Sequence, residues 1–289
     1  MNPIFSWFLS GIGCASICAL SVVLAIFGWR LRSKRSGRFL TAGGVLLLLV
    51  AGLAASVVPV WMHASGCAAL VLTLLLQLVG RFDRVSLVLL CAGSGLIAAG
   101  VGLEVSNAFG LRQSAPGARV VVVGDSLSAG IRSNEVTWPV KLAALRGVPV
   151  RNLSIPGARV AQGRRLIGEE NLRGSVVIIF MGGNDMFSES DPVAFERELG
   201  ALVRLAKDKG GVPLLVQFPG LPAQGAFPAS VARVARSEHV GFIPRWVLCS
   251  ILARKGSTVD GLHLSPGGHA ALAKAISAWV QLGTPQPSN

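Results

Sequence analysis

A serine, an aspartate and a histidine in the second half of the chain could together perform acyl transfer. Ser126 follows an apolar run that ends at Gly124, and Asp260 and His263 lie three residues apart near the end of the chain. A serine hydroxyl becomes a nucleophile when a base takes its proton, and an imidazole does so when a carboxylate fixes its tautomer. Gly124-Asp125-Ser126 alone is also common turn chemistry. The residue types allow His263 to take the Ser126 proton and Asp260 to orient the imidazole.

The same reaction needs hydrogen-bond donors where negative charge develops on the substrate oxygen. Candidate donors are the amide of Ser126, an amide in a glycine turn such as Gly157, and the side-chain amide of Asn184. Asp125 and Asp185 are interpreted as turn-stabilising acceptors rather than as a catalytic acid pair. No metal ion or cofactor is needed, and the chain has no paired cysteine spacing of a metal site.

Short runs rich in β-branched residues predict the strands that position these side chains. The runs lie at 119–123, 148–153, 175–180, 212–218 and 240–243. They alternate with helix-like segments, and near-continuous apolar strands of this kind are typical of a parallel sheet covered on both faces. Because parallel sheets bind ligands at the carboxyl ends of their strands, the sequence predicts a doubly wound α/β fold with the polar clusters at one edge.

The clearest helix signal is Asp191 followed by Pro192, a capping residue before a proline at the first helical position. Phe195, Leu199 and Leu202 then recur on one helical face. Further helices are predicted near 137–146, 160–172, 228–238, 246–255 and 266–281.

Four motifs in this half resemble, in order and spacing, the sequence blocks of the GDSL/SGNH hydrolase family. They are Gly124-Asp125-Ser126-Leu127-Ser128, the turn at Gly157, Gly183-Asn184-Asp185 and Asp260-x-x-His263. The resemblance covers about 119–282 and implies a flavodoxin-like hydrolase fold. It also implies that Ser126, Asp260 and His263 are catalytic and that Ser126, Gly157 and Asn184 form the oxyanion hole. The Gly-Asp-Ser-Leu-Ser-Ala-Gly string is most similar to bacterial esterases, thioesterases and lysophospholipases. The sequence Ile-Pro-Gly-Ala-Arg around Gly157 departs from the family pattern and could aim that amide differently.

Other residues near these motifs have two interpretations each. Nearby arginines could hold a phosphate or carboxylate, or could be solvated surface residues; they are Arg132, Arg159, Arg164 and Arg165. Nearby apolar residues could line an acyl groove or belong to the core; they are Met186, Phe187, Phe227, Trp246 and Leu248. His269 is interpreted as a helix-surface or hydrogen-bonding residue.

The composition of the chain is unusual for a soluble protein. Only 14% of the 289 residues are charged and 52% are hydrophobic, against roughly 25% charged residues in ordinary globular chains. Mean hydropathy is +0.60. The net charge of +13 is scattered rather than gathered in one basic run with aromatic residues, which argues against nucleic-acid binding and favours attraction to anionic lipid.

Long uncharged stretches in the first half predict an all-α transmembrane region at 1–105, with spans near 4–29, 39–60, 65–80 and 85–105. The loops at 30–38 and 81–84 carry positive charge and are expected on the cytoplasmic side. Four spans then place both termini outside. Residues 106–118 are predicted to form a linker rich in turn formers, and 119–289 a hydrolase domain on the extracytoplasmic, periplasmic side.

Together these expectations describe a membrane-anchored serine hydrolase that cleaves an ester, with an acyl ester of a lipid or lysophospholipid as the favoured substrate. An O-acetyl esterase or acetyltransferase acting on envelope polysaccharide is the alternative within the enzyme class. A non-catalytic membrane scaffold is least favoured, because every catalytic position is filled. The acyl chain length, the leaving group and the oligomeric state are left open.

Overall fold

A computed structural model of the chain describes residues 17–18, 20–24, 27, 30, 40–48, 60–78, 84–108, 113–115, 119–188, 190–220 and 224–282. These residues cluster into two compact units. The helical unit contains the helices up to Ala108 together with residues 224–226, and the α/β unit contains the rest of the described chain from Gln113 onward. Ser126, Asn184 and His263 all belong to the α/β unit.

The α/β unit is built around a parallel sheet of five strands in the order β3-β2-β4-β5-β6. The strands are β2 (Arg119–Gly124), β3 (Val150–Asn152), β4 (Ser175–Phe180), β5 (Val212–Val216) and β6 (Gly241–Ile243). The chain starts inside the sheet, adds one edge strand and then crosses back to build the other side. Each strand overlaps a predicted β-branched run, so the prediction of a doubly wound parallel sheet is confirmed.

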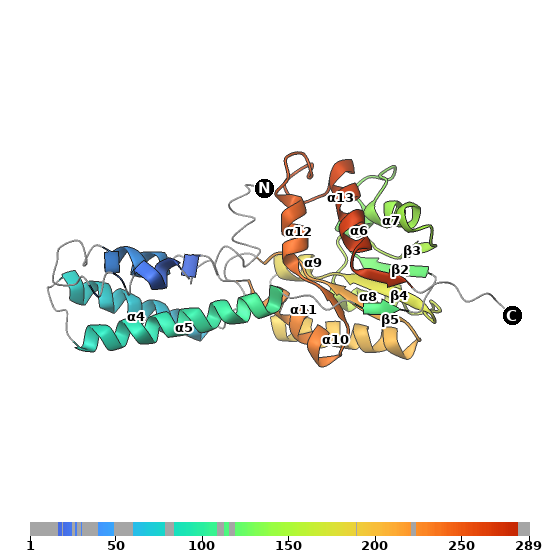
Figure 1. Cartoon of the computed structure of the whole chain (residues 1–289). Helices are drawn as coiled ribbons and strands as arrows, with labels where there is room; N and C mark the ends of the chain where they lie inside the picture. The colour runs from blue at the N-terminus through green and yellow to red at the C-terminus, as the bar shows by residue number, and fades with distance from the viewer. Residues whose placement is uncertain are drawn as a thin grey trace. The chain divides into compact units, whose positions relative to one another are not determined.

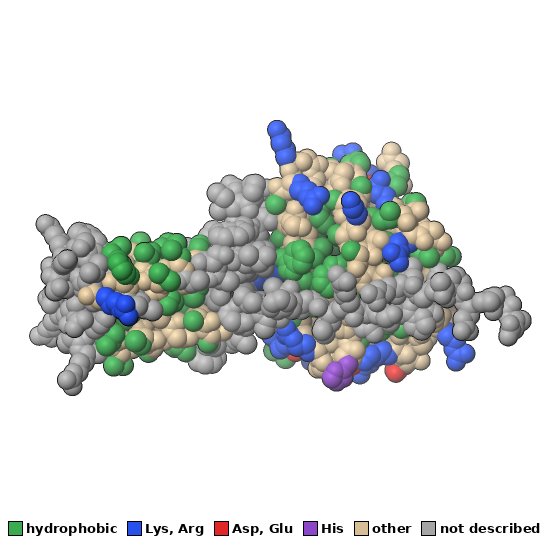
Figure 2. Space-filling model, in the orientation of Figure 1, with side chains coloured by type: hydrophobic (Ala, Val, Ile, Leu, Met, Phe, Trp, Pro, Cys, Tyr) green, Lys and Arg blue, Asp and Glu red, His purple; other side chains and the backbone are tan. Residues whose placement is uncertain are grey.

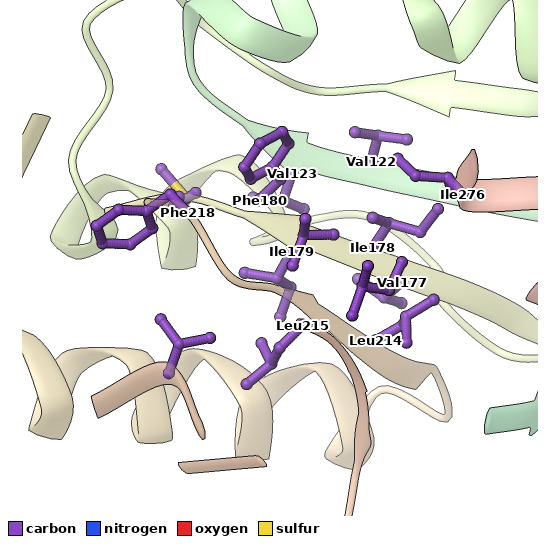
Figure 3. Close-up of a cluster of buried hydrophobic side chains, with 14 of the residues drawn as sticks. Val122, Val123, Val177, Ile178, Ile179, Phe180, Leu214, Leu215, Phe218 and Ile276 are labelled. Atoms are coloured by element: carbon purple, nitrogen blue, oxygen red, sulfur yellow. The ribbon is translucent and has the colours of Figure 1, made fainter. Parts of the chain in front are cut away.

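The centre of the sheet is apolar on both faces. All six residues of β4 are buried, and β2 is buried after its first residue. Val122 of β2 pairs with Ile178 of β4, and Figure 3 shows both near Leu214 of β5 and Ile276. Because helices cover both faces, side chains that alternate in direction along a strand all reach an interior, which explains the continuous apolar runs.

Helices lie on both faces of the sheet (Figure 1). α7 packs against α13, and α8 packs against α10. α10 begins as predicted, because Asp191 caps it by accepting hydrogen bonds from the amides of Val193 and Ala194. The helices described in this unit are α6 (Ser126–Ala129), α7 (Trp138–Arg146), α8 (Val160–Leu166), α9 (Gly183–Phe187), α10 (Pro192–Asp208), α11 (Ala226–Ser237), α12 (Arg245–Leu252) and α13 (Pro266–Ser277).

Three helices end at least three residues earlier than the sequence predicts. α8 ends at Leu166 rather than near 172, α12 at Leu252 rather than near 255, and α13 at Ser277 rather than near 281. The residues after α13 form β7 (Val280–Leu282), which pairs in parallel with β1 (Gln113–Ala115) inside the predicted linker. Helical periodicity cannot reveal this pairing, because its partners lie at opposite ends of the unit in sequence.

In the helical unit, α4 (Val60–Leu78) and α5 (Arg84–Ala108) pack closely against each other. A Cβ atom on Gly93 would lie 2.9 Å from the Leu70 side chain and 3.1 Å from the Gly66 carbonyl oxygen. Leu70 and Ile97 are buried. The absence of side chains at the two glycines therefore allows the two helix backbones to approach.

None of the helices in the described part of the chain combines the length and apolar character that a membrane crossing requires. α4 and α5 overlap the spans predicted near 65–80 and 85–105, so the prediction that these segments cross a membrane is not supported. The spans predicted near 4–29 and 39–60 lie largely outside the described residues.

Candidate active site

Ser126 lies just past the carboxyl end of β2, at the first position of α6. Asp125 caps that helix: its backbone is extended, and its side chain accepts a hydrogen bond from the Leu127 amide at 3.0 Å. The strand therefore turns into a helix at the serine. Within the described chain the Ser126 N–H has no acceptor, because it begins the helix, so this amide is available to a ligand.

The side chains of Ser126, His263 and Asp260 form one hydrogen-bonded line. Ser126 Oγ lies 3.1 Å from His263 Nε2, and His263 Nδ1 lies 2.6 Å from Asp260 Oδ2. Hydrogen bonds from the side chain and amide of His263 and from the Leu262 amide hold the pKa of Asp260 well below its usual range. An ionised carboxylate only accepts hydrogen bonds. We therefore assign the proton to Nδ1, which leaves Nε2 to accept from the Ser126 hydroxyl.

The loop that carries Asp260 and His263 is closed by its own backbone. Asp260 Oδ1 accepts hydrogen bonds from the amides of Leu262 at 3.0 Å and His263 at 2.7 Å. The Val259 amide donates to the His263 carbonyl oxygen at 2.9 Å, and Ser265 then caps α13. These bonds hold acid and base together, although the Asp260 side chain is 49% exposed and that of His263 is 24% exposed.

The Asn184 side chain joins the two loops that carry the other predicted oxyanion donors. Its Nδ2 atom donates to the Ala158 carbonyl oxygen at 3.1 Å and lies 3.4 Å from Asp125 Oδ2. Ala158 follows Gly157, and Asp125 precedes Ser126. Gly157 has a φ of +76°, which favours glycine, and its N–H has no acceptor among the described residues. Asn184 therefore links all three predicted donors at one edge of the sheet.

Gly182 sets the direction of the turn before Asn184. Its φ of +121° favours glycine, and a Cβ atom there would lie 2.3 Å from the Phe218 ring and 2.8 Å from the Phe195 ring. Both rings are buried. A larger residue would have to displace them, so the aromatic core determines where α9 begins and where Asn184 lies.

Two buried carboxylates lie next to the predicted catalytic residues. Burial raises the pKa of Asp125 to about 6, against the lowering effects of the Leu127 amide and of nearby His263. Burial also raises the pKa of Asp185, whose carboxylate accepts a hydrogen bond from the Val160 amide at 3.0 Å. Each carboxylate thus binds an amide at the start of a helix, in agreement with the interpretation as a turn-stabilising acceptor.

A second pair of imidazole and carboxylate, Glu135 and His269, was not apparent from the sequence. His269 is 1% exposed; its Nδ1 lies 3.1 Å from the Trp138 amide nitrogen and its Nε2 lies 2.9 Å from Glu135 Oε1. Burial alone would raise the pKa of Glu135, but hydrogen bonds from the Ile131 amide and from His269 hold it below its usual value. Of the two interpretations of His269, the hydrogen-bonding one is therefore confirmed and the helix-surface one is not. No local signal pairs these residues, because 134 positions separate them.

The candidate acyl-groove residues differ in burial, and the candidate anion-binding arginines differ in their surroundings. Met186, Phe227 and Leu248 are buried, Trp246 is partly buried, and Phe187 is exposed. Arg164 lies 3.8 Å from Glu198, Arg159 and Arg165 are exposed, and Arg132 lines a pocket together with Lys141. Lys141 was not singled out by the sequence. No cluster of histidine, cysteine, aspartate or glutamate side chains within the described ranges is arranged to hold a metal ion.

The site contains the chemical groups that nucleophilic acyl transfer requires. A hydroxyl faces an imidazole nitrogen that can accept its proton, and a carboxylate holds the other imidazole nitrogen. Two amides without acceptors in the described chain and one side-chain amide lie on the loops around the hydroxyl. These parts come from the carboxyl ends of β2, β3 and β4 and from the loop before α13.

The α/β unit is similar to several bacterial esterases. The chain is 30% identical over 178 residues to esterase TesA of Pseudomonas aeruginosa, covering 56% of this chain and 85% of that protein. It is 30% identical over 157 residues to thioesterase 1/protease 1/lysophospholipase L1 of Escherichia coli, covering 50% of this chain and 74% of that protein. A crystal structure of the psychrotrophic esterase EstA from Pseudoalteromonas sp. matches with a TM-score of 0.50 at 17% identity, covering 56% of this chain and 96% of that one, which shows a common fold.

The sequence model of the GDSL-like Lipase/Acylhydrolase family matches residues 122–271, just over half of the chain. The match begins in β2, before Ser126, and ends in α13, after His263. The chain therefore belongs to the GDSL-like lipase/acylhydrolase family and is an esterase-type hydrolase of that family.

Proposed function

We propose that the chain hydrolyses an ester through an acyl-enzyme on Ser126, with His263 as general base and acid and Asp260 as the orienting carboxylate. The observation that carries this proposal is the line of contacts from Ser126 Oγ to His263 Nε2 at 3.1 Å and from His263 Nδ1 to Asp260 Oδ2 at 2.6 Å. The family and the esterase relatives support the reaction class.

In the first half of the proposed reaction, Ser126 Oγ attacks the ester carbonyl carbon while its proton moves to His263 Nε2. The tetrahedral intermediate places negative charge on the former carbonyl oxygen. His263 then gives the proton to the leaving alcohol oxygen as the carbon–oxygen bond breaks, and the acyl group stays on Ser126. In the second half, water gives a proton to His263 and attacks the acyl carbon. Release of the carboxylic acid returns the proton to Ser126 Oγ.

The oxyanion would be met by the amides of Ser126 and Gly157 and by one N–H of Asn184. Asn184 has two side-chain N–H bonds. One is held by the Ala158 carbonyl oxygen at 3.1 Å, whereas the contact with Asp125 Oδ2 is longer, at 3.4 Å. The N–H near Asp125 makes the weaker hydrogen bond and is the one that can turn to the substrate oxygen.

The favoured substrate within this proposal is an acyl ester of a lipid or lysophospholipid. Apolar side chains are exposed on the loops that carry the proposed donors: Ile155 precedes Gly157 in the same turn, and Phe187 ends the helix that carries Asn184. Ile155 is 52% exposed and Phe187 is 54% exposed. Exposed apolar groups beside a reacting centre gain free energy by covering an acyl chain, at about 0.8 kcal/mol per buried methylene.

The proposal also includes location: the N-terminal region attaches the enzyme to a membrane, with the hydrolase domain on the periplasmic side. Its support is the uncharged stretches at 1–29 and 39–80 and the apolar surface of the helical unit. Figure 2 shows hydrophobic side chains over much of the described surface of that unit; Leu75, Val85 and Val88 are among the exposed residues. Carbonate extraction of membranes and a C-terminal reporter would test it, and a cytoplasmic reporter signal would contradict the orientation.

The catalytic proposal is tested with a fluorophosphonate probe and a panel of esters of increasing acyl length. We expect the full-length chain to be labelled at Ser126, and we expect the Ser126→Ala variant to be neither labelled nor active. We also expect kcat/KM to rise from acetyl to octanoyl esters and beyond. Failure of labelling in the folded protein would contradict the acyl-enzyme. Activity limited to acetyl esters would contradict the lipid substrate and favour an O-acetyl esterase or acetyltransferase acting on envelope polysaccharide.

A further inference from the structure

A pocket of about 350 Å³ lies beside the loop that carries Asp260 and His263. Val259 and Pro266, from the two ends of that loop, form one wall, and residues of the segment after α6 form the other. Val259 directly precedes Asp260, and Pro266 comes three residues after His263, so about 11 Å is the greatest distance that the chain allows from His263 to Pro266. The pocket therefore borders the loop that carries the imidazole, although Ser126, Asp260 and His263 are not among its lining residues.

The pocket carries two cations that have no carboxylate partner among the described residues, Arg132 and Lys141. Asn134 adds a side-chain amide to the same lining. This set of donors is suited to a phosphate or carboxylate group, since guanidinium, ammonium and amide all donate hydrogen bonds to anionic oxygens.

Two carboxylates lie near the pocket, and both already accept hydrogen bonds from other groups of the chain. Glu135 also lines the pocket, but its carboxylate accepts from the Ile131 and Arg132 amides and from His269, and its side chain is only 12% exposed. Asp260 is bound by the His263 side chain and by two amides. The side chains left to donate hydrogen bonds to a ligand in the pocket are therefore those of Arg132, Lys141 and Asn134.

The direction of proton transfer indicates which part of a substrate would reach this pocket. In the proposed reaction His263 gives its proton to the leaving alcohol, so that alcohol must lie on the His263 side of Ser126. The carbonyl oxygen lies on the opposite side, toward the amides of Gly157 and Asn184. Because the pocket borders the His263 loop, it is placed to contact the alcohol portion of the ester rather than the acyl chain.

We propose that Arg132 and Lys141 form an anion subsite that selects esters whose leaving alcohol carries a phosphate or a carboxylate. This inference rests on the proposed ester hydrolysis and adds the charge of the substrate to it. Each cation would make a charge-assisted hydrogen bond, whose effect is reduced because Arg132 is exposed and Lys141 is partly exposed. The expected preference over a neutral ester is about tenfold in kcat/KM.

The test compares three esters with one acyl chain on the full-length protein: 1-octanoylglycerol, 1-octanoylglycerol 3-phosphate and 3-octanoylglycerate. We expect the wild type to hydrolyse the charged esters with a higher kcat/KM than the neutral ester. In the Arg132→Gln/Lys141→Gln variant, the charged-to-neutral ratio of kcat/KM should fall about tenfold. The matched control is Arg254→Gln/Lys274→Gln, which removes the same charge at exposed positions outside the pocket lining and should keep the wild-type ratio. The phosphate and carboxylate arms show which anion is preferred.

The measured quantity is the ratio of kcat/KM values between esters. A partial loss of folded enzyme lowers all of these values by the same factor and therefore leaves the ratio unchanged. A second measurement is independent of hydrolysis: glycerol 3-phosphate binding to the wild type and to both double variants, by calorimetry. Binding that is weakened only by the Arg132/Lys141 changes, without any ester turnover, would overturn the proposed function but support the subsite. Turnover with a charged-to-neutral ratio near one, or a ratio that the Arg132/Lys141 changes leave unaltered, would overturn the subsite while leaving ester hydrolysis in place.

Discussion

His269 Nε2 lies 2.9 Å from Glu135 Oε1, so the helix that follows the His263 loop is fastened to the segment that follows the Ser126 turn. The other ring nitrogen, His269 Nδ1, accepts a hydrogen bond from the Trp138 amide at 3.1 Å. Trp138 Nε1 in turn donates to Ser128 Oγ at 3.2 Å, two positions beyond Ser126. A chain of polar contacts therefore connects α6, which carries Ser126, with α13, which follows the loop that carries His263.

We predict that His269→Ala destabilises the fold by about 2–4 kcal/mol, because it leaves the Trp138 amide and the Glu135 carboxylate without their partner and opens a small cavity. Denaturant unfolding measures this change. Lys274→Ala, at an exposed position of the same helix, is the control and should change stability by less than about 0.5 kcal/mol. Equal stability of the His269→Ala variant and the wild type would show that the network is not required.

Asp125 makes stability depend on pH in a defined direction. Burial raises its pKa from 3.8 to about 6, so the folded state holds a proton that the unfolded state releases near pH 4. Stability from this group is complete below about pH 4 and is lost as pH rises through 6, by up to about 3 kcal/mol. The difference in stability between wild type and Asp125→Asn should therefore shift in favour of the variant between pH 4 and 8. Parallel curves of stability against pH for the wild type and Asp125→Asn would contradict this prediction. Asp208→Asn, at an exposed position, is the control.

The catalytic line should behave as one unit. We expect Ser126→Ala and His263→Ala each to lower kcat by about 10⁴-fold or more, because neither group can perform its step without the other. The double variant should be little worse than either single variant. Steady-state kinetics on the best ester, with thermal melts to verify folding, provide the measurement. Losses that multiply in the double variant would indicate that the two side chains act independently.

Asn184→Ala should lower kcat by about 10²-fold with little change in KM, because an oxyanion donor acts mainly in the transition state. The variant also removes the donor to the Ala158 carbonyl oxygen, so we expect a modest fall in melting temperature. Asn171→Ala, at an exposed position outside the proposed site, is the matched control. A rise in KM with unchanged kcat would instead assign Asn184 to ground-state binding.

Phe187 and Phe227 should respond differently to truncation. Phe187 is exposed at the end of α9, so Phe187→Ala should flatten the rise of kcat/KM with acyl length while leaving stability nearly unchanged. Phe227 is 4% exposed, and its ring centroid lies 5.4 Å from that of Phe195. Phe227→Ala should therefore cost about 3–5 kcal/mol of stability without changing the preference for acyl length. The ester panel and melting curves distinguish the two variants. If kcat/KM stopped rising with acyl length in Phe227→Ala but not in Phe187→Ala, Phe227 rather than Phe187 would contact the acyl chain.

The sequence alone determined the parts of this protein whose signals are local. The strands β2, β4, β5 and β6 are largely continuous apolar runs, because they are buried on both faces, and that pattern can be read without knowing the neighbours. The cap at Asp191 is equally local, since its side chain binds amides two and three residues ahead. The Asp260 and His263 pair belongs to the same class, because the two residues meet inside one loop.

Contacts between distant segments were decided only by the tertiary structure. β1 pairs with β7, His269 binds Glu135, and Arg132 and Lys141 line a pocket whose other wall comes from Val259 and Pro266. A pattern of residues along the chain records which faces are apolar, but it does not record which polar group will lie opposite another after the sheet has formed. Packing of α7 against α13 brings these groups together, so their pairing and the charge of the pocket follow from the fold rather than from any single motif.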